Sequence, residues 1–171
     1  MKNNPPSADD DTPKQKHSDV PGPAVIIPEG IYKIYTHLNN TSVVDMRLVG
    51  TPKPAQIFHD NNEPESRWRI KYDDRFDAHT LTNQYPGARY LYVVNYSEVY
   101  AEQTLNIVKP QYHWTFKNVG SDTNLFYIEN VYTLHVLDVE GSGTADRTKI
   151  NALPYKGSAN QKFKLVKLSD F

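Results

Sequence analysis

The sequence predicts an all-β domain built from three similar units, and three observations carry this prediction. Short apolar stretches of about four to six residues follow one another from residue 25 onward, mostly with apolar and polar residues alternating. No apolar stripe with the helical period continues over three turns. Residues that suit strands are abundant, with 12 Tyr, 6 Phe and 2 Trp in 171 residues.

The N-terminal segment, residues 1–24, differs in composition from the rest of the chain. It holds five prolines and an acidic run at residues 9–11, but no aromatic and almost no aliphatic side chain. Such a segment buries too little apolar surface to offset the entropy lost on ordering. We therefore expect residues 1–24 to form a disordered arm and residues 25–171 to form one domain.

Within residues 25–171 the strand pattern repeats three times, at about residues 25–74, 75–121 and 122–171. Each unit opens with an apolar strand, and its second strand ends in an acid or an amide, at Asp45, Asn95 and Asp138. Each unit closes with an aromatic strand entry, at Trp68, Trp114 and Phe163, which are 46 and 49 residues apart. A repeat of this length also suits a propeller blade, but a propeller needs at least about four blades. Three four-stranded units that close into one small barrel use the whole segment and leave no open sheet edge.

The third unit carries two motifs that specify a family. Residues 137–141 are Leu-Asp-Val-Glu-Gly, and residues 157–163 are Gly-Ser-Ala-Asn-Gln-Lys-Phe. Together they resemble the LDV.G and G..NQ.W motifs of the ricin-B-type lectins, with Phe163 in place of the tryptophan. The first unit is a weaker match through residues 44–46 and 66–68, and the second keeps only Trp114. The opening at residues 27–32 looks like the start of the fungal single-domain members that lack cysteine.

The resemblance implies a β-trefoil, with six barrel strands capped by three hairpins and up to three shallow sugar sites. In such sites an acid at the end of the second strand accepts hydrogen bonds from sugar hydroxyls, an aromatic ring stacks on the sugar, and an amide completes the contacts. In the third unit these positions fall on Asp138, Gly141 in the turn, and Asn160. The stacking position is Leu153, so we expect Tyr155, two residues later, to replace it. Gln161 and Phe163 are expected to serve folding.

In the first unit the resemblance places the acid at Asp45 and the stacking ring at Phe58. Asn61 and Asn62 lie on the following loop, and Asn62 is taken as the amide, while Glu65 stands at the motif's own amide position. A core position for Phe58 stays open as an alternative. In the second unit Asn95 takes the place of the acid, and the stacking position counted back from Trp114 is Thr104. We therefore expect no sugar site in the second unit.

Composition restricts the partners and the compartment. The formal net charge is −1, and Lys and Arg are scattered, which disfavours a nucleic-acid surface because such a surface needs clustered cations. No apolar run is long enough to cross a bilayer, and no signal-peptide pattern is visible at the start. We expect a cytoplasmic protein, with unconventional secretion left open, that binds glycans or glycoproteins and neither nucleic acid nor the membrane interior.

No catalytic, cofactor or metal motif emerges from the sequence. The six histidines are dispersed, there is no cysteine, and no nucleophile or phosphate-loop motif occurs. The sequence therefore predicts a non-catalytic lectin without cofactor or metal, with a role in defence and with homodimerisation as one route to useful affinity. Two alternatives stay open: a β-trefoil protease inhibitor that acts through an exposed loop, and a partner-binding subunit of a larger complex.

Overall fold

The computed structural model of the protein describes residues 17–171, and its regular structure is strands and short 3-10 turns. The strands are β1 (Ala24–Val25), β2 (Gly30–Thr36), β3 (Ser42–Met46), β4 (Lys53–His59), β5 (Trp68–Asp73), β6 (Ala78–Asn83), β7 (Arg89–Val94), β8 (Glu98–Gln103), β9 (Trp114–Val119), β10 (Asp122–Asn130), β11 (Val136–Val139), β12 (Ile150–Leu153) and β13 (Phe163–Ser169). The 3-10 turns are η1 (Pro64–Ser66), η2 (Pro110–Tyr112), η3 (Glu140–Ser142) and η4 (Ala159–Gln161).

Six of the strands close into a barrel. Following the antiparallel pairs around the ring gives β2, β5, β6, β9, β10, β13 and again β2. These are the first and last strands of three consecutive four-stranded repeats, β2–β5, β6–β9 and β10–β13. The expected boundary at residues 74/75 lies in the turn between β5 and β6, and the one at residues 121/122 lies where β10 begins.

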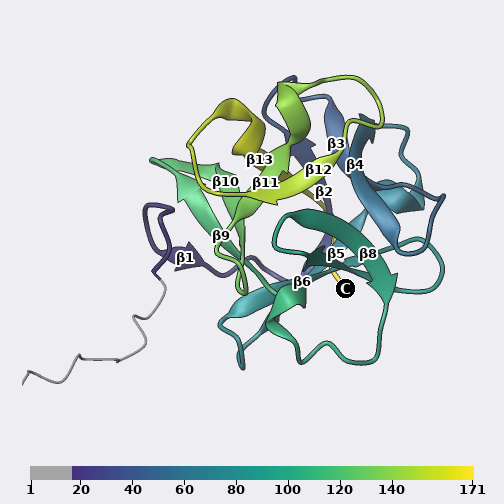
Figure 1. The fold of residues 1–171 in the computed structure, drawn as a ribbon, viewed down its shortest axis with the longest axis horizontal. Helices are drawn as coiled ribbons and strands as arrows, with labels where there is room; N and C mark the ends of the chain where they lie inside the picture. The colour runs from purple at the N-terminus through teal and green to yellow at the C-terminus, as the bar shows by residue number, and fades with distance from the viewer. Residues whose placement is uncertain (1–16) are drawn as a thin grey trace, which may run out of the picture.

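The two middle strands of each repeat form a hairpin, and the three hairpins cap the barrel. The hairpins are β3–β4, β7–β8 and β11–β12, and β8 also pairs with both β4 and β12. Figure 1 shows these hairpins gathered around the central barrel strands. The predicted all-β trefoil with three pseudo-threefold repeats is confirmed.

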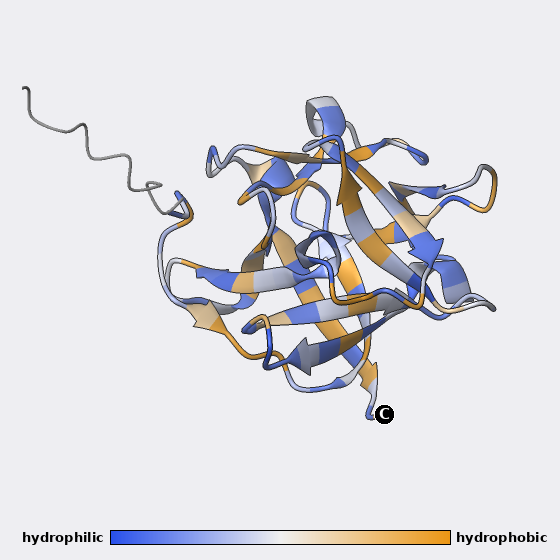
Figure 2. Ribbon diagram, turned by 60° about the horizontal axis from the view of Figure 1, so that its bottom comes forward, coloured by the Kyte–Doolittle hydropathy of each residue, from blue (hydrophilic) through white to orange (hydrophobic). Residues whose placement is uncertain are grey.

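The three closing aromatic residues lie at equivalent places in the core. Trp68, Trp114 and Phe163 are the first residues of β5, β9 and β13, each follows a 3-10 turn, and each is fully buried. The indole N–H groups of the two tryptophans donate to carbonyl oxygens on the second strand of their own repeat, Val44 at 2.9 Å and Leu91 at 3.0 Å. Orange and blue bands alternate along the strands in Figure 2, as expected when one face of each strand meets the core.

Residues 17–24, which the sequence placed in a disordered arm, lie against the barrel in the structure. β1 pairs with β9, Val20 is buried, and the Lys117 ammonium donates to Ser18 Oγ at 2.8 Å. The hydroxyl of Ser18 donates in turn to the Glu129 carboxylate at 2.5 Å. The predicted domain start at residue 25 is therefore too late, because a few contacts to β9 and β10 order a polar segment. The rest of the predicted arm, residues 1–16, lies outside the described residues.

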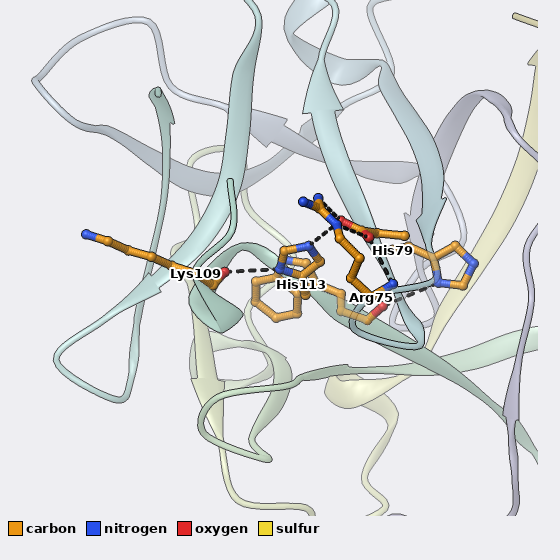
Figure 3. Close-up of polar contacts among 6 residues, drawn as sticks. Arg75, His79, Lys109 and His113 are labelled. Atoms are coloured by element: carbon orange, nitrogen blue, oxygen red, sulfur yellow. Dashed lines mark hydrogen bonds and ion pairs between the residues drawn. The ribbon is translucent and has the colours of Figure 1, made fainter. Parts of the chain in front are cut away.

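Two buried histidines tie the second repeat to its neighbours, and Figure 3 draws both, with the contact between His113 and Lys109 as a dashed line. The ring of His113 lies between the Lys109 carbonyl, 3.0 Å from Nδ1, and the Asp73 carboxylate, 3.2 Å from Nε2. Hydrogen bonds from Arg75 lower the pKa of Asp73 well below its usual range. His79 Nε2 accepts the Ile27 N–H at 3.0 Å, so this histidine anchors the segment that precedes β2.

Among the described residues, no helix is long and apolar enough to span a membrane.

Candidate functional site

The pairing of the three hairpins identifies which residues occupy equivalent positions on the face turned away from the core. Asp45 pairs with Gln56 in the first hairpin, and Asp138 pairs with Asn151 in the third. Each acid directly follows a fully buried core residue, Val44 or Leu137. The two acids therefore occupy the same position in different repeats, as the sequence predicted.

In the first repeat, neighbouring side chains hold the Asp45 carboxylate in place. Gln56 Nε2 donates to one carboxylate oxygen at 2.7 Å, and the Ser66 hydroxyl donates to the other at 2.8 Å. Asp45 is only 2% exposed, and this burial raises its pKa. The two donors act in the opposite direction because they stabilise the ionised form.

Beside Asp45 the surface is hollowed into a depression of about 240 Å³, here called the first depression. Phe58 lines it together with Gln56; these residues are two apart on β4, so both side chains lie on the same face of the strand. Gln56 Oε1 is buried and has no hydrogen-bond partner within residues 17–171. Since Gln56 Nε2 donates to the Asp45 carboxylate, the orientation of the amide is fixed with Oε1 closed to solvent.

Of the two loop asparagines that the sequence offered, Asn61 lines the first depression, whereas Asn62 was the one taken as the amide. Asn62 is exposed, with a left-handed backbone (φ 61°), and its N–H donates to Asp60 Oδ1 at 3.1 Å. Asx turns shape this loop, and the two adjacent asparagines cannot be told apart by counting along the sequence. Arg47, Glu65 and Arg147 complete the charged rim of the depression.

In the third repeat, two side-chain amides engage the Asp138 carboxylate. Asn160 Nδ2 donates to Oδ1 at 3.0 Å and Gln161 Nε2 donates to Oδ2 at 2.9 Å. Gln161 Oε1 also accepts the backbone N–H groups of Lys156 and Gly157, so this residue does serve folding as expected. Burial raises the pKa of Asp138, as it does for Asp45.

Gly141 and Tyr155 flank this third-repeat site differently. Gly141 has a left-handed backbone (φ 59°) in η3, and open space surrounds the position of a Cβ there. Tyr155 lies edge-on to Tyr127, with 5.0 Å between ring centroids, in a small apolar cluster with Val20 and Val136. The structure thus brings Asp138 and Asn160 together directly, whereas the ring of Tyr155 is engaged by a neighbouring ring.

In the second repeat the sequence assigned the wrong residues to the equivalent positions. Tyr92, which pairs with Tyr100, takes the place of the acid, whereas Asn95 lies in the hairpin turn with φ 49°. Glu102 takes the place of Phe58, and Thr104 lies beyond the end of β8. The hairpin register would have identified both positions, but a count from the closing aromatic did not.

Within the described residues, no cluster of three or more His, Cys, Asp or Glu side chains is arranged to hold a metal. The His59 and Asp146 pair, with Nδ1 2.7 Å from Oδ2, lies near the first depression and is exposed.

A comparison with known proteins bears on the family that the sequence motifs resemble. A family model described as ricin-type β-trefoil lectin domain-like matches residues 110–170, which include Asp138, Asn160 and Phe163. The resemblance to the ricin-B-type lectins is therefore confirmed for this part of the chain. No curated protein matches the sequence significantly.

Three solved structures illustrate the fold. The designed threefold-symmetric protein ThreeFoil is 20% identical with a TM-score of 0.71, and the match covers 81% of this chain and 99% of ThreeFoil. The ricin B-like lectin of Macrolepiota procera, solved with lactose, is 19% identical with a TM-score of 0.66, and the match covers 84% of this chain and 99% of the lectin. A proteinase inhibitor from Coprinopsis cinerea is 17% identical with a TM-score of 0.69, and the match covers 84% of this chain and all of the inhibitor. At these identities the likeness establishes the β-trefoil fold.

Proposed function

We propose that this chain, a β-trefoil whose residues 110–170 match the ricin-type lectin family, is a non-catalytic lectin that binds glycans in the first depression. One observation carries the proposal: two donors hold the Asp45 carboxylate beside the ring of Phe58, which lines the same depression. Each Asp45 oxygen accepts one hydrogen bond and can accept another, which a sugar hydroxyl supplies, and a ring provides apolar contact with little loss of side-chain entropy.

A shallow site of this kind binds a single sugar weakly. A monosaccharide has about 12 heavy atoms, and at roughly −0.3 kcal/mol per atom its affinity lies in the millimolar range. Useful affinity then needs longer glycans or several sites. We propose the Asp138, Gly141 and Asn160 region as the second such site, equivalent to the first by the internal threefold symmetry.

The proposal is tested on a glycan array with the wild-type chain and Asp45→Asn. The substitution keeps the size of the side chain but removes the negative charge, so we expect glycan binding to fall at least about tenfold, as for the loss of a charge-assisted hydrogen bond. The exposed Asp19→Asn is the matched control and should bind like the wild type. Thermal unfolding checks that both variants are folded. If the wild type binds no glycan on the array, the proposed function is wrong.

One observation favours the alternative function, a protease inhibitor. Leu105, in the loop between β8 and η2, is fully exposed (105%), although burying a leucine is worth about 1.5–3 kcal/mol. An apolar side chain presented in this way suits the specificity pocket of a protease, and the Coprinopsis cinerea inhibitor shares the fold.

Incubation with papain, trypsin and chymotrypsin tests this alternative. It predicts inhibition of at least one protease by the wild type, and loss of that inhibition in Leu105→Gly. Val108→Gly in the same loop is the control, because Val108 is less exposed (56%). Full activity of all three proteases at a large excess of the chain would exclude the alternative.

A further inference from the structure

A cavity of about 340 Å³, here called the barrel-side cavity, lies on the outer face of the barrel. Its lining residues come from β5, β6 and the turn between them, together with Tyr90 on β7 and Ile107 in the loop between β8 and η2. The barrel-side cavity shares no lining residue with the first depression. It is therefore a separate concave surface of the molecule.

The register of β5 and β6 places cationic and hydroxyl side chains opposite one another in this cavity. Lys71 lies directly opposite Thr80, and Arg69 lies directly opposite Thr82. Ile70, between the two cations on β5, is buried in the core, so the four polar side chains lie on the outer face. Opposite residues on one face of a sheet have Cβ atoms roughly 5 Å apart, so one small ligand can contact both members of a pair.

Four polar side chains that line the barrel-side cavity have no partner. Within residues 17–171, no hydrogen bond or ion pair engages the Lys71 ammonium or the hydroxyls of Thr80, Thr82 and Tyr90. Thr80 is only 5% exposed, and polar side chains at such positions are usually hydrogen-bonded. Polar groups without partners that converge on one concave surface are typical of a binding site.

The acidic residues of the cavity are engaged by Arg75. Asp73 accepts hydrogen bonds from Nε, Nη2 and the backbone N–H of Arg75, at 2.8, 2.6 and 3.1 Å, and it also contacts His113 Nε2 at 3.2 Å. A carboxylate has about four acceptor positions, so Asp73 has little capacity left for a ligand. The hydrogen bond to Asp73, with a smaller contribution from the charge of Asp74, raises the pKa of Arg75. Among the described residues, Lys71 is the lining cation that forms no ion pair.

We propose that the barrel-side cavity binds the oxyanion of a phosphate or sulfate ester. The side chains without partners there can all donate: they are one ammonium and three hydroxyls. Arg69 adds further donors, because Glu29 engages only its Nε and Nη2. An oxyanion of this kind offers an acceptor on each oxygen, and hydrogen bonds between ionised partners are the strong ones. The inference goes beyond the proposed lectin function and does not depend on it.

The experiment titrates inorganic phosphate and inorganic sulfate into the isotope-labelled full chain and follows the amide signals by NMR, with ionic strength held constant by sodium chloride. We expect saturable shifts within residues 69–82. Lys71→Met removes the charge of an exposed side chain and should weaken binding about tenfold. Thr82→Val removes one hydroxyl and keeps the branched shape, so binding should weaken by a smaller factor. Lys164→Met, an exposed lysine on β13 outside the cavity, is the matched control and should bind like the wild type.

A second charge variant should act in the opposite direction. Asp74 lines the same cavity, and its negative charge repels an anion. Asp74→Asn should therefore tighten phosphate binding roughly twofold or more, and the gain should shrink as salt is added. A variant that is merely less stable would not gain affinity, so this result separates a binding role from a structural one.

Two esters distinguish the sources of the oxyanion. O-phosphoserine and N-acetylglucosamine 6-sulfate are titrated in the same way, and the ester that binds more tightly than its inorganic ion identifies the ligand class. Asp45→Asn should bind phosphate as the wild type does, so failure of the lectin function leaves this inference intact. Shifts that do not saturate, or an equal loss of affinity in Lys164→Met and Lys71→Met, would show that the cavity is not an oxyanion site.

Discussion

At the scale of single residues, sequence reasoning succeeded where one physical demand determines the side chain. Trp68, Trp114 and Phe163 were predicted as the aromatic strand entries that close the three units, and all three are fully buried at the start of a barrel strand. Asp45 and Asp138 were predicted as equivalent, and their hairpin positions agree. Unpartnered atoms such as Gln56 Oε1 could not be predicted, because only the folded contacts show which acceptor lacks a donor.

The indole hydrogen bonds lead to a prediction at the same scale. Trp68→Phe leaves the Val44 carbonyl without its donor and opens a small cavity, so the free energy of unfolding should fall by about 2–3 kcal/mol. Trp114→Phe makes the same change at Leu91 and should cost about as much. Chemical denaturation measures both.

In the third repeat the equivalent position is held by Phe163, whose ring has no N–H group to donate, so it can be compared with the two tryptophans. Phe163→Tyr should not mimic the tryptophans, since a hydroxyl at the far end of the ring would be buried in an apolar core. An unchanged denaturation midpoint in Trp68→Phe would show that the Val44 carbonyl needs no partner from the indole.

At the scale of strands and loops, sequence reasoning failed where loop lengths differ between repeats. Counting back from the closing aromatic assumes a constant loop, but the second repeat has 14 residues from Tyr100 to Trp114, against 12 from Gln56 to Trp68 and from Asn151 to Phe163. The strand register stays constant because the three hairpins share one core, whereas surface loops tolerate insertion. The count therefore landed on Thr104 in place of Glu102.

At the scale of the whole molecule, one buried histidine links the N-terminal segment to the barrel and makes stability depend on pH. Burial lowers the pKa of His79 to about 4, from an ordinary value of 6.5. The neutral ring accepts the Ile27 N–H, and a protonated ring cannot. Between these two pKa values the unfolded chain binds more protons than the folded one, so stability is complete above pH 6.5 and is lost as the pH falls toward 4.

The pKa difference corresponds to about 3 kcal/mol of unfolding free energy across this window. His79→Gln retains an acceptor for Ile27 but does not titrate, so its loss of stability from pH 6.5 to 4 should be smaller than that of the wild type by about this amount. Burial also raises the pKa of Asp45 and Asp138, and their contributions favour the folded state at low pH. These contributions are the same in both proteins, so they cancel when the two are compared over the same pH series. If the free energy of unfolding falls by the same amount in both proteins between pH 6.5 and 4, His79 is not the group whose protonation loosens residues 17–27 from the barrel.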